Sequence, residues 1–199
     1  MMKHIRNAVA AAGLLFATVA SAATYTTILT GPQESPANTS GGIGAALVKF
    51  DATTHVLDIG VAFSGLLGES TAAHIHCCTT TAGSGTAGVA TELPSFTNFP
   101  LDLHTGAYQH TFDTALTSSW NPAFLSANGG TAAGAEAAFL TGLNSGSAYL
   151  NIHSSIYPNG EIRGFLVNVS PVPEPGTYAM FGLGLPAVLM LARRRRRPT

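Results

Sequence analysis

Several short segments of this chain alternate apolar residues with polar or small ones, which is the period of a β-strand. In the segment His55–Phe63, every second residue from position 57 onward is Leu, Ile, Val or Phe. The same alternation runs through Ser147–His153 and Glu161–Val169, and the turn sequence Pro158-Asn159-Gly160 between them predicts a hairpin. Because short strands with Gly- and Pro-rich turns are typical of sandwiches and barrels, we expect an all-β fold.

One region of the chain breaks this alternation. Alanine is frequent in Thr131–Leu143, which favours a helix over a strand. A second short helix is predicted within Ser118–Asn128, with Trp120, Phe124 and Leu125 on its packing side. We expect this short helical insertion to cover one open end of the β-structure.

The first 22 residues have the layout of a secretory signal peptide. A short basic region is followed by the apolar run Ala8–Ala20 and by the small-residue site Ala20-Ser21-Ala22. We therefore expect residues 1–22 to be removed, and the protein to be exported to a compartment where thiols tend to be oxidised.

The C-terminal residues form three parts in a fixed order. Pro173-Glu174-Pro175 comes first, then the apolar segment Tyr178–Ala192, then Arg193, Arg194, Arg195, Arg196 and Arg197. A helix over the apolar segment would be roughly 22 Å long, which is short of the roughly 30 Å hydrocarbon core of a bilayer. This segment alone predicts a weak membrane anchor, with its arginines on the cytoplasmic side.

This three-part end, residues 171–199, resembles a PEP-CTERM sorting signal. The resemblance implies that an exosortase-type membrane enzyme recognises and processes the tail. It also implies an intermediate held in the inner membrane through residues 178–192, and a final place in the cell envelope or extracellular matrix. Such signals belong to Gram-negative bacteria that make extracellular polysaccharide.

Charge along the remaining body is strongly one-sided. Residues 23–173 contain nine acidic residues against Lys49 and Arg163, a net charge of −7. Such a body lacks the basic residues needed to neutralise a row of phosphates, so nucleic-acid binding is excluded as its function.

Three stretches of the body stand out together: Thr30–Pro36, Ala73–His76 and Ala148–Gly164. The last contains the polar and glycine positions Asn151, His153, Gly160, Glu161, Arg163 and Gly164. In this order they resemble the CHRD (chordin-type) domain. The resemblance implies that residues 23–170 form an immunoglobulin-like antiparallel β-sandwich, and it implies a fold more than a biochemical function.

The motif His74-Ile75-His76 is the first candidate for a metal site. Two residues that are two positions apart on a strand point to the same face, so both imidazoles can reach one ion. His153 alone, Cys77 or Cys78 alone, or His153 together with one of these cysteines would complete a ligand set that suits copper or zinc. His-x-His also occurs in copper–zinc superoxide dismutase, but no second ligand cluster is recognisable here, so a redox enzyme has the least support.

A purely structural interpretation explains the same residues. Each imidazole can bond backbone carbonyls, or Glu161 across the sheet, and Glu161 and Arg163 are expected to form an ion pair with each other. The adjacent Cys77 and Cys78 can form a vicinal disulfide, bind a metal, pair with another molecule or stay free. A bond between neighbours closes almost no loop and would stabilise the fold little.

The sequence contains no nucleophile elbow, no phosphate-binding loop and no Cys-x-x-Cys motif, so we expect no enzyme. The predicted function is that of an exported, non-catalytic envelope or extracellular-matrix module. It would interact with extracellular polysaccharide or matrix proteins. The alternative is a copper- or zinc-binding extracellular protein that uses the His-x-His and Cys-Cys motif.

Overall fold

The structure is a computed structural model that describes residues 22–169. The predicted signal peptide, except its last residue, and the whole sorting signal, from Pro173 through Arg197, lie outside the described residues. Within residues 22–169, no helix is both long enough and apolar enough to cross a membrane.

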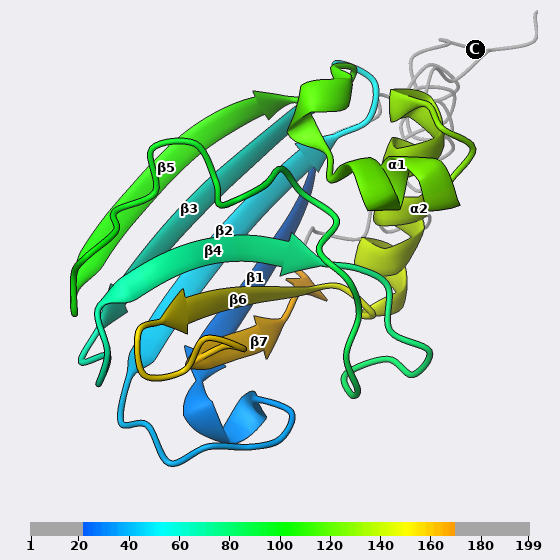
Figure 1. The fold of residues 1–199 in the computed structure, drawn as a ribbon. Coiled ribbons are helices and arrows are strands. Elements are labelled where there is room, and N and C mark those ends of the chain that lie inside the picture. The colour runs from blue at the N-terminus through cyan, green and yellow to red at the C-terminus, as the bar shows by residue number, and fades with distance from the viewer. Residues whose placement is uncertain (1–21, 170–199) are drawn as a thin grey trace, which may run out of the picture.

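Eight strands form one antiparallel sheet. They are β1 (Ala23–Thr30), β2 (Ile43–Asp51), β3 (Val56–Ser64), β4 (Ser70–His76), β5 (Gly106–Asp113), β6 (Tyr149–Ser154), β7 (Ile162–Phe165) and β8 (Val167–Asn168). Their order is β4-β6-β7-β1-β2-β3-β5, and β8 pairs with β1. The sheet curls into a half-barrel, with β4 and β6 facing the β2–β3–β5 half (Figure 1).

This architecture confirms the all-β prediction. It does not confirm the immunoglobulin-like arrangement, because β1 pairs with β2 along one edge and with β7 and β8 along the other. The strands therefore belong to one continuous hydrogen-bonded sheet, whose two halves face each other.

The core lies inside the curl and is built from alternate residues of each strand. On β3, the predicted apolar face is confirmed, since Leu57, Ile59, Val61 and Phe63 are all buried. Side chains of the opposite half, such as Ile75, reach the same core cluster. Each fully buried side chain of this size stabilises the fold by roughly 1.5–3 kcal/mol.

The predicted helical insertion is confirmed and covers one end of the curled sheet (Figure 1). It consists of the short 3-10 helix η2 (Thr117–Ser119) and the helices α1 (Pro122–Ala127) and α2 (Ala132–Ser145). The side chains of Asn121 and Thr131 accept hydrogen bonds from backbone N–H groups in the first turns of α1 and α2. Both helices are therefore capped at their N-termini. Phe139 of α2 contacts Phe50 edge-on at 6.0 Å between ring centroids, which anchors the insertion to the sheet.

The predicted hairpin is β6–β7, joined through Pro158-Asn159-Gly160. On β4, β6 and β7, apolar residues such as Ile75, Leu150 and Ile162 face the core. The intervening polar residues point to the other face of the sheet, yet several of them are also buried. Loops cover this second face, including the short 3-10 helix η1 (Gly31–Gln33) and the segment 77–100 that runs alongside β4.

Candidate metal centre

Pairing between β4 and β6 brings the candidate histidines together. His74 lies opposite Asn151, His76 opposite Tyr149, and Ala72 opposite His153. Because partners directly opposite in an antiparallel pair point to the same face, all three imidazoles lie on the loop-covered face. Strand register, not proximity in sequence, therefore adds His153 to the His74–His76 pair.

One ring nitrogen of each histidine lies within 4.8 Å of those of the other two. The shortest distance, 3.4 Å, joins His74 Nδ1 and His153 Nε2. Two nitrogens bound to one zinc ion at Zn–N distances of about 2.0–2.1 Å and tetrahedral angles are about 3.3 Å apart. The observed spacing therefore suits two ligands of one metal ion.

The other ring nitrogen of each histidine is fixed by a backbone carbonyl of a covering loop. His74 Nε2 bonds Pro94 O at 2.7 Å, and His76 Nδ1 bonds Ala87 O at 2.9 Å. His153 Nδ1 bonds Pro158 O at 3.0 Å. A carbonyl only accepts, so these three nitrogens carry the protons and the three converging nitrogens carry lone pairs.

Burial keeps these histidines neutral. It lowers the pKa of His74 and of His76 to about 4, against weaker raising effects of their carbonyl partners. It also lowers the pKa of His153. His76 Nε2 is buried and has no hydrogen-bond partner. Three neutral imidazoles whose other ring N–H groups are held by carbonyls have the protonation state and the fixed ring orientation that metal ligands need.

An aromatic and a cationic side chain close one side of the cluster. The ring of Tyr149 stacks on His76 at 4.8 Å between centroids, and its hydroxyl bonds Ala87. The guanidinium carbon of Arg163 lies 4.7 Å from the centre of the Tyr149 ring. His74 and His76 are buried, whereas His153 is partly exposed and leaves a route to solvent.

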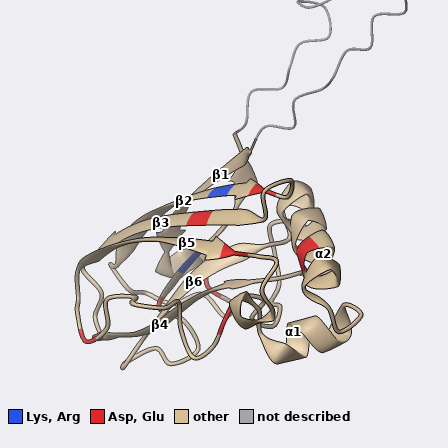
Figure 2. Cartoon of the chain, turned by 90° about the horizontal axis from the view of Figure 1, so that it is seen from above, with Lys and Arg blue, Asp and Glu red and all other residues tan. Residues whose placement is uncertain are grey.

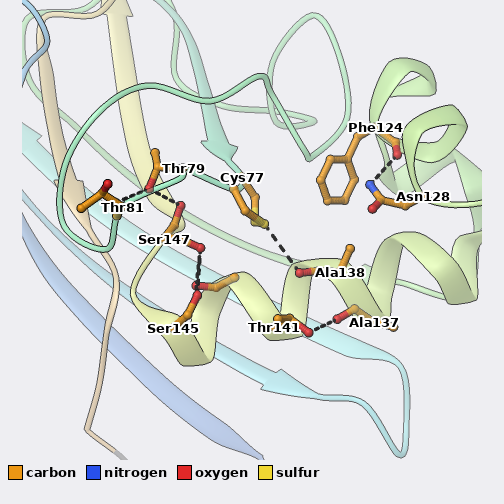
Figure 3. The surroundings of a disulfide bond; sticks show 12 residues. Cys77, Thr79, Thr81, Phe124, Asn128, Ala137, Ala138, Thr141, Ser145 and Ser147 are labelled. Carbon is orange, nitrogen blue, oxygen red and sulfur yellow. Dashed lines mark hydrogen bonds between the residues drawn. A yellow bond between two sulfur atoms is a disulfide. The ribbon is translucent and has the colours of Figure 1, made fainter.

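The two cysteines do not join this cluster. Cys77 and Cys78 form a disulfide with each other across a cis peptide bond, so neither sulfur is a free thiolate. The disulfide packs against α2, where a Cβ on Gly142 would lie 2.2 Å from Cys77 Sγ, and Cys78 Sγ lies 3.6 Å from Ala138 O (Figure 3). The candidate ligand set is therefore narrower than the predicted one and contains the three histidines.

The predicted ion pair between Glu161 and Arg163 is wrong. Glu161 is fully buried and accepts hydrogen bonds from Ser40 Oγ and from the backbone N–H groups of Leu67 and Gly68. Arg163 instead lies beside Glu34, with Nε 3.8 Å from Oε2. The two side chains bond different loops: Glu161 accepts from Ser40 and residues 67–68, whereas Arg163 donates to Gln33 O and Gly85 O.

The remaining motif residues have structural positions around this face. Asn151 is buried on β6, directly opposite His74 of β4 and two residues before His153. Gly160 has a φ of +130°, which only glycine adopts readily. A Cβ on Gly164 would lie 2.3 Å from Ile28 O, so glycine is needed where β7 approaches β1.

The sequence did not reveal every residue of the site. The carbonyls of Ala87, Pro94 and Pro158 carry no sequence signal, because every residue has a carbonyl. Glu34 lies far from Arg163 in the chain. Tyr149 could have been found, because the alternation in Ser147–His153 places it on the face of His153.

Two family models match the chain. The CHRD domain model matches residues 25–166, and the PEP-CTERM protein-sorting motif model matches residues 171–197. No curated protein and no solved structure matches. Both matched models are sorting or structural domains and neither is an enzyme family. The sorting motif marks an exported protein that an exosortase system processes on its way through the membrane to the cell envelope. The chain thus belongs to the CHRD domain family and carries a PEP-CTERM sorting motif at its C-terminal end.

Proposed function

We propose that this exported domain binds one zinc or copper ion through His74, His76 and His153. The observation that carries the proposal is the convergence of three unprotonated ring nitrogens within 4.8 Å of one another. The second nitrogen of each ring is held by a loop carbonyl. Imidazole nitrogen suits both metals, and three protein ligands leave a further position for water or another ligand.

Proton counting favours a metal over a purely structural cluster. Backbone bonding of the imidazoles, as the structural interpretation expects, is present at all three histidines. A hydrogen bond between His74 Nδ1 and His153 Nε2 would need one more proton than the two neutral rings hold while both keep their carbonyls. Burial opposes that extra positive charge. A bound cation would satisfy both lone pairs, and that of His76 as well.

The metal site is proposed as a binding site without catalysis. Within residues 22–169, the side-chain ring nitrogens of these three histidines lie near backbone carbonyls and near one another, and no carboxylate is among their partners. No carboxylate bonded to this cluster is therefore in place to act as the general base for a metal-bound water.

The experiment is metal uptake by the purified chain, measured by elemental analysis and native mass spectrometry after dialysis against zinc or copper. We expect one ion per chain, lost when His76→Ala removes the imidazole whose Nε2 has no partner. His110→Ala is the matched control, because His110 lies on β5, outside the cluster. Equal uptake by the wild type and His76→Ala, or no uptake by either, would overturn the proposal.

A second proposal is that the processed protein acts as an interaction module in the envelope or extracellular matrix of a Gram-negative bacterium. It is supported by an exposed apolar set on the outer face of β1, β2 and β8: Ile28, Ile43, Leu47 and Val167 are each 43–60% exposed. Strand register places these side chains on one face, and exposed apolar patches mark interaction surfaces. As part of this second proposal, the domain is related to immunoglobulin-like sandwiches. Before processing, residues 178–192 hold the protein transiently in the inner membrane.

Retention on purified extracellular polysaccharide tests this second role. We expect the wild type to be retained and Leu47→Ser to be retained less, since the substitution removes apolar surface without touching the core. Passage of the wild type without retention would contradict polysaccharide as the partner.

A further inference from the structure

The two edges of the curled sheet differ in how their backbone groups are satisfied. β4 forms one edge and β5 forms the other (Figure 1). On the β4 edge, backbone groups of Ala73, Ile75 and Cys77 bond the covering segment 88–96. On the β5 edge, β3 is the one segment within residues 22–169 that bonds the backbone of residues 106–112. The far side of β5 is therefore the open edge of the described sheet.

The open backbone groups belong to alternate residues of β5. In an antiparallel pair, the N–H and C=O of one residue point to the same side, and this side alternates along the strand. Thr114 N–H donates to His55 O, which continues the regular register between β3 and β5. The even-numbered residues of β5 thus bond β3, whereas Ala107, Gln109 and Thr111 direct their N–H and C=O groups to the open side. All three of these residues are exposed.

β5 lacks the features by which proteins protect an open edge. Such features are a Pro or Lys in the strand, a bulge, or a very short strand. β5 has eight residues, its sequence GAYQHTFD contains neither Pro nor Lys, and its register with β3 has no shift. Asp113, the last residue of β5, is its one acidic residue, and Figure 2 shows the strand otherwise in the colour of uncharged residues. An edge of this kind is a template for a further strand.

We propose that the open edge of β5 pairs with β5 of a second copy of this chain, in antiparallel orientation about a twofold axis at Gln109. This register places Gln109 opposite the partner's Gln109, and Ala107 opposite the partner's Thr111. The three open N–H groups and three open C=O groups of each chain would then form six hydrogen bonds between the chains. No other twofold register pairs these three residues with one another and leaves none of them open.

The side chains on the inner face of β5 are complementary in this register. Phe112 would lie opposite the partner's Gly106, and Tyr108 opposite the partner's His110. Aromatic side chains stabilise cross-strand pairs, and an aromatic ring over a strand glycine covers backbone that the glycine leaves bare. The inner face of the pairing would therefore be closed by rings from both chains.

The outer face brings no like charges together. The two Gln109 side chains would face each other, and each amide offers both a donor and an acceptor. Asp113 would lie opposite the partner's Thr105, far from the partner's Asp113. The strongly charged residue of the strand is thus kept away from its own copy.

The rest of the chain favours a second copy as the occupant of this edge. The residues that follow the described part include Pro171, Pro173 and Pro175, and proline has no N–H for strand pairing. The chain's own continuation is therefore a poor strand for β5. Because the β4 edge is already covered, pairing through β5 closes after two copies and does not propagate into a fibre.

Analytical ultracentrifugation of the purified chain tests the association. EDTA excludes metal bridges, and about 0.15 M salt screens the net negative charge. We expect a species of two chains whose share rises with concentration up to about 0.1 mM. Gln109→Pro removes an outward N–H without touching a bond to β3, and should raise the dissociation constant at least about tenfold. Gln109→Ala keeps that N–H and should still associate. Both variants keep the C-terminal tail, so association through the tail would be equal in both.

Cross-linking tests the register. Directly opposite residues of a hydrogen-bonded pair have Cα atoms about 5.5 Å apart, within the range of a disulfide. Gln109→Cys should therefore form a disulfide-linked pair of chains with oxidised glutathione. Ala107→Cys is the matched control, because the two copies of residue 107 would lie roughly 14 Å apart. The described residues contain no free cysteine, so the introduced thiol is the one that reacts.

Single chains in the wild type, equal association of the wild type and Gln109→Pro, or no preference for cross-linking of Gln109→Cys over Ala107→Cys would each overturn the proposal. If circular dichroism shows that Gln109→Pro does not fold, Gln109→Lys decides instead. That substitution places two positive charges opposite each other at an exposed position. Single chains in Gln109→Lys would then support the proposal, and unchanged association would overturn it.

Discussion

His74 Nδ1 and His153 Nε2 lie 3.4 Å apart, although each ring already donates its other N–H to a backbone carbonyl, Pro94 O and Pro158 O. Two lone pairs thus face each other in a largely buried site. This relationship connects two strands and two loops, and it makes the loop-covered face of β4 and β6 the chemically distinctive part of the domain.

The vicinal disulfide should be dispensable for metal binding. We expect the double variant Cys77→Ala/Cys78→Ala to keep one ion per chain and to change the free energy of unfolding by about 1 kcal/mol or less, because a bond between neighbours closes almost no loop. Urea unfolding and elemental analysis check both parts. Loss of the ion in this variant would show that the sulfurs are ligands.

Glu161 should be essential for stability and not for metal uptake. Glu161→Gln leaves Ser40 Oγ and the N–H groups of Leu67 and Gly68 without a charged acceptor in a fully buried site. We expect a loss of about 3 kcal/mol in the free energy of unfolding at pH 7. Glu69→Gln, at an exposed position, should change it by less than about 0.5 kcal/mol.

The same carboxyl should shape the acid unfolding of the domain. Burial alone raises the pKa of Glu161, but hydrogen bonds from Ser154, Ser40, Leu67 and Gly68 together lower it by more. The net shift of the pKa is therefore downward. A carboxyl with a lowered folded pKa stabilises the fold above its unfolded pKa of about 4.3, and this contribution is lost as pH falls through the folded value. The stability difference between wild type and Glu161→Gln should therefore shrink below about pH 4. A difference that stays constant down to the folded pKa would refute this assignment.

The contribution of His55 to stability should be lost as pH rises, whereas that of Glu161 is lost as pH falls. Its Nδ1 lies 2.9 Å from Glu136 Oε2, and this hydrogen bond raises the pKa of His55. A raised folded pKa means that the stabilisation is complete below the unfolded pKa of about 6.5 and is lost as pH rises through the folded value. Thermal unfolding of the wild type and of His55→Asn should differ at pH 6 and converge by about pH 9. Asn also tolerates the positive φ of 58° at this position. A difference that grows with pH would contradict the ion pair.

Phe139 should be the key residue of the helical insertion. It is fully buried and contacts both Phe50 and Trp120. Phe139→Ala should lower the free energy of unfolding by about 3–5 kcal/mol through lost burial and a cavity. Leu116→Ala, at a 53% exposed position nearby, should have little effect. Chemical denaturation of the two variants checks the comparison.

Sequence periodicity predicted the strands whose two faces differ in polarity, as on β3, and the hairpin whose turn contains Pro158 and Gly160. It also placed His74 and His76 on one face. It could not supply the register of β4 against β6, which brings His153 opposite Ala72, because pairing between distant strands depends on the whole sheet. The partners of Glu161 and Arg163 were missed for a similar reason: both side chains bond loops far away in the chain.

X-ray absorption spectroscopy of the purified chain loaded with zinc is the most direct test of the proposed metal centre. The account predicts three imidazole nitrogens at about 2.0–2.1 Å from the ion and no sulfur at about 2.3 Å. A spectrum with a sulfur ligand, with fewer than three imidazoles, or with no protein ligand at all would contradict it.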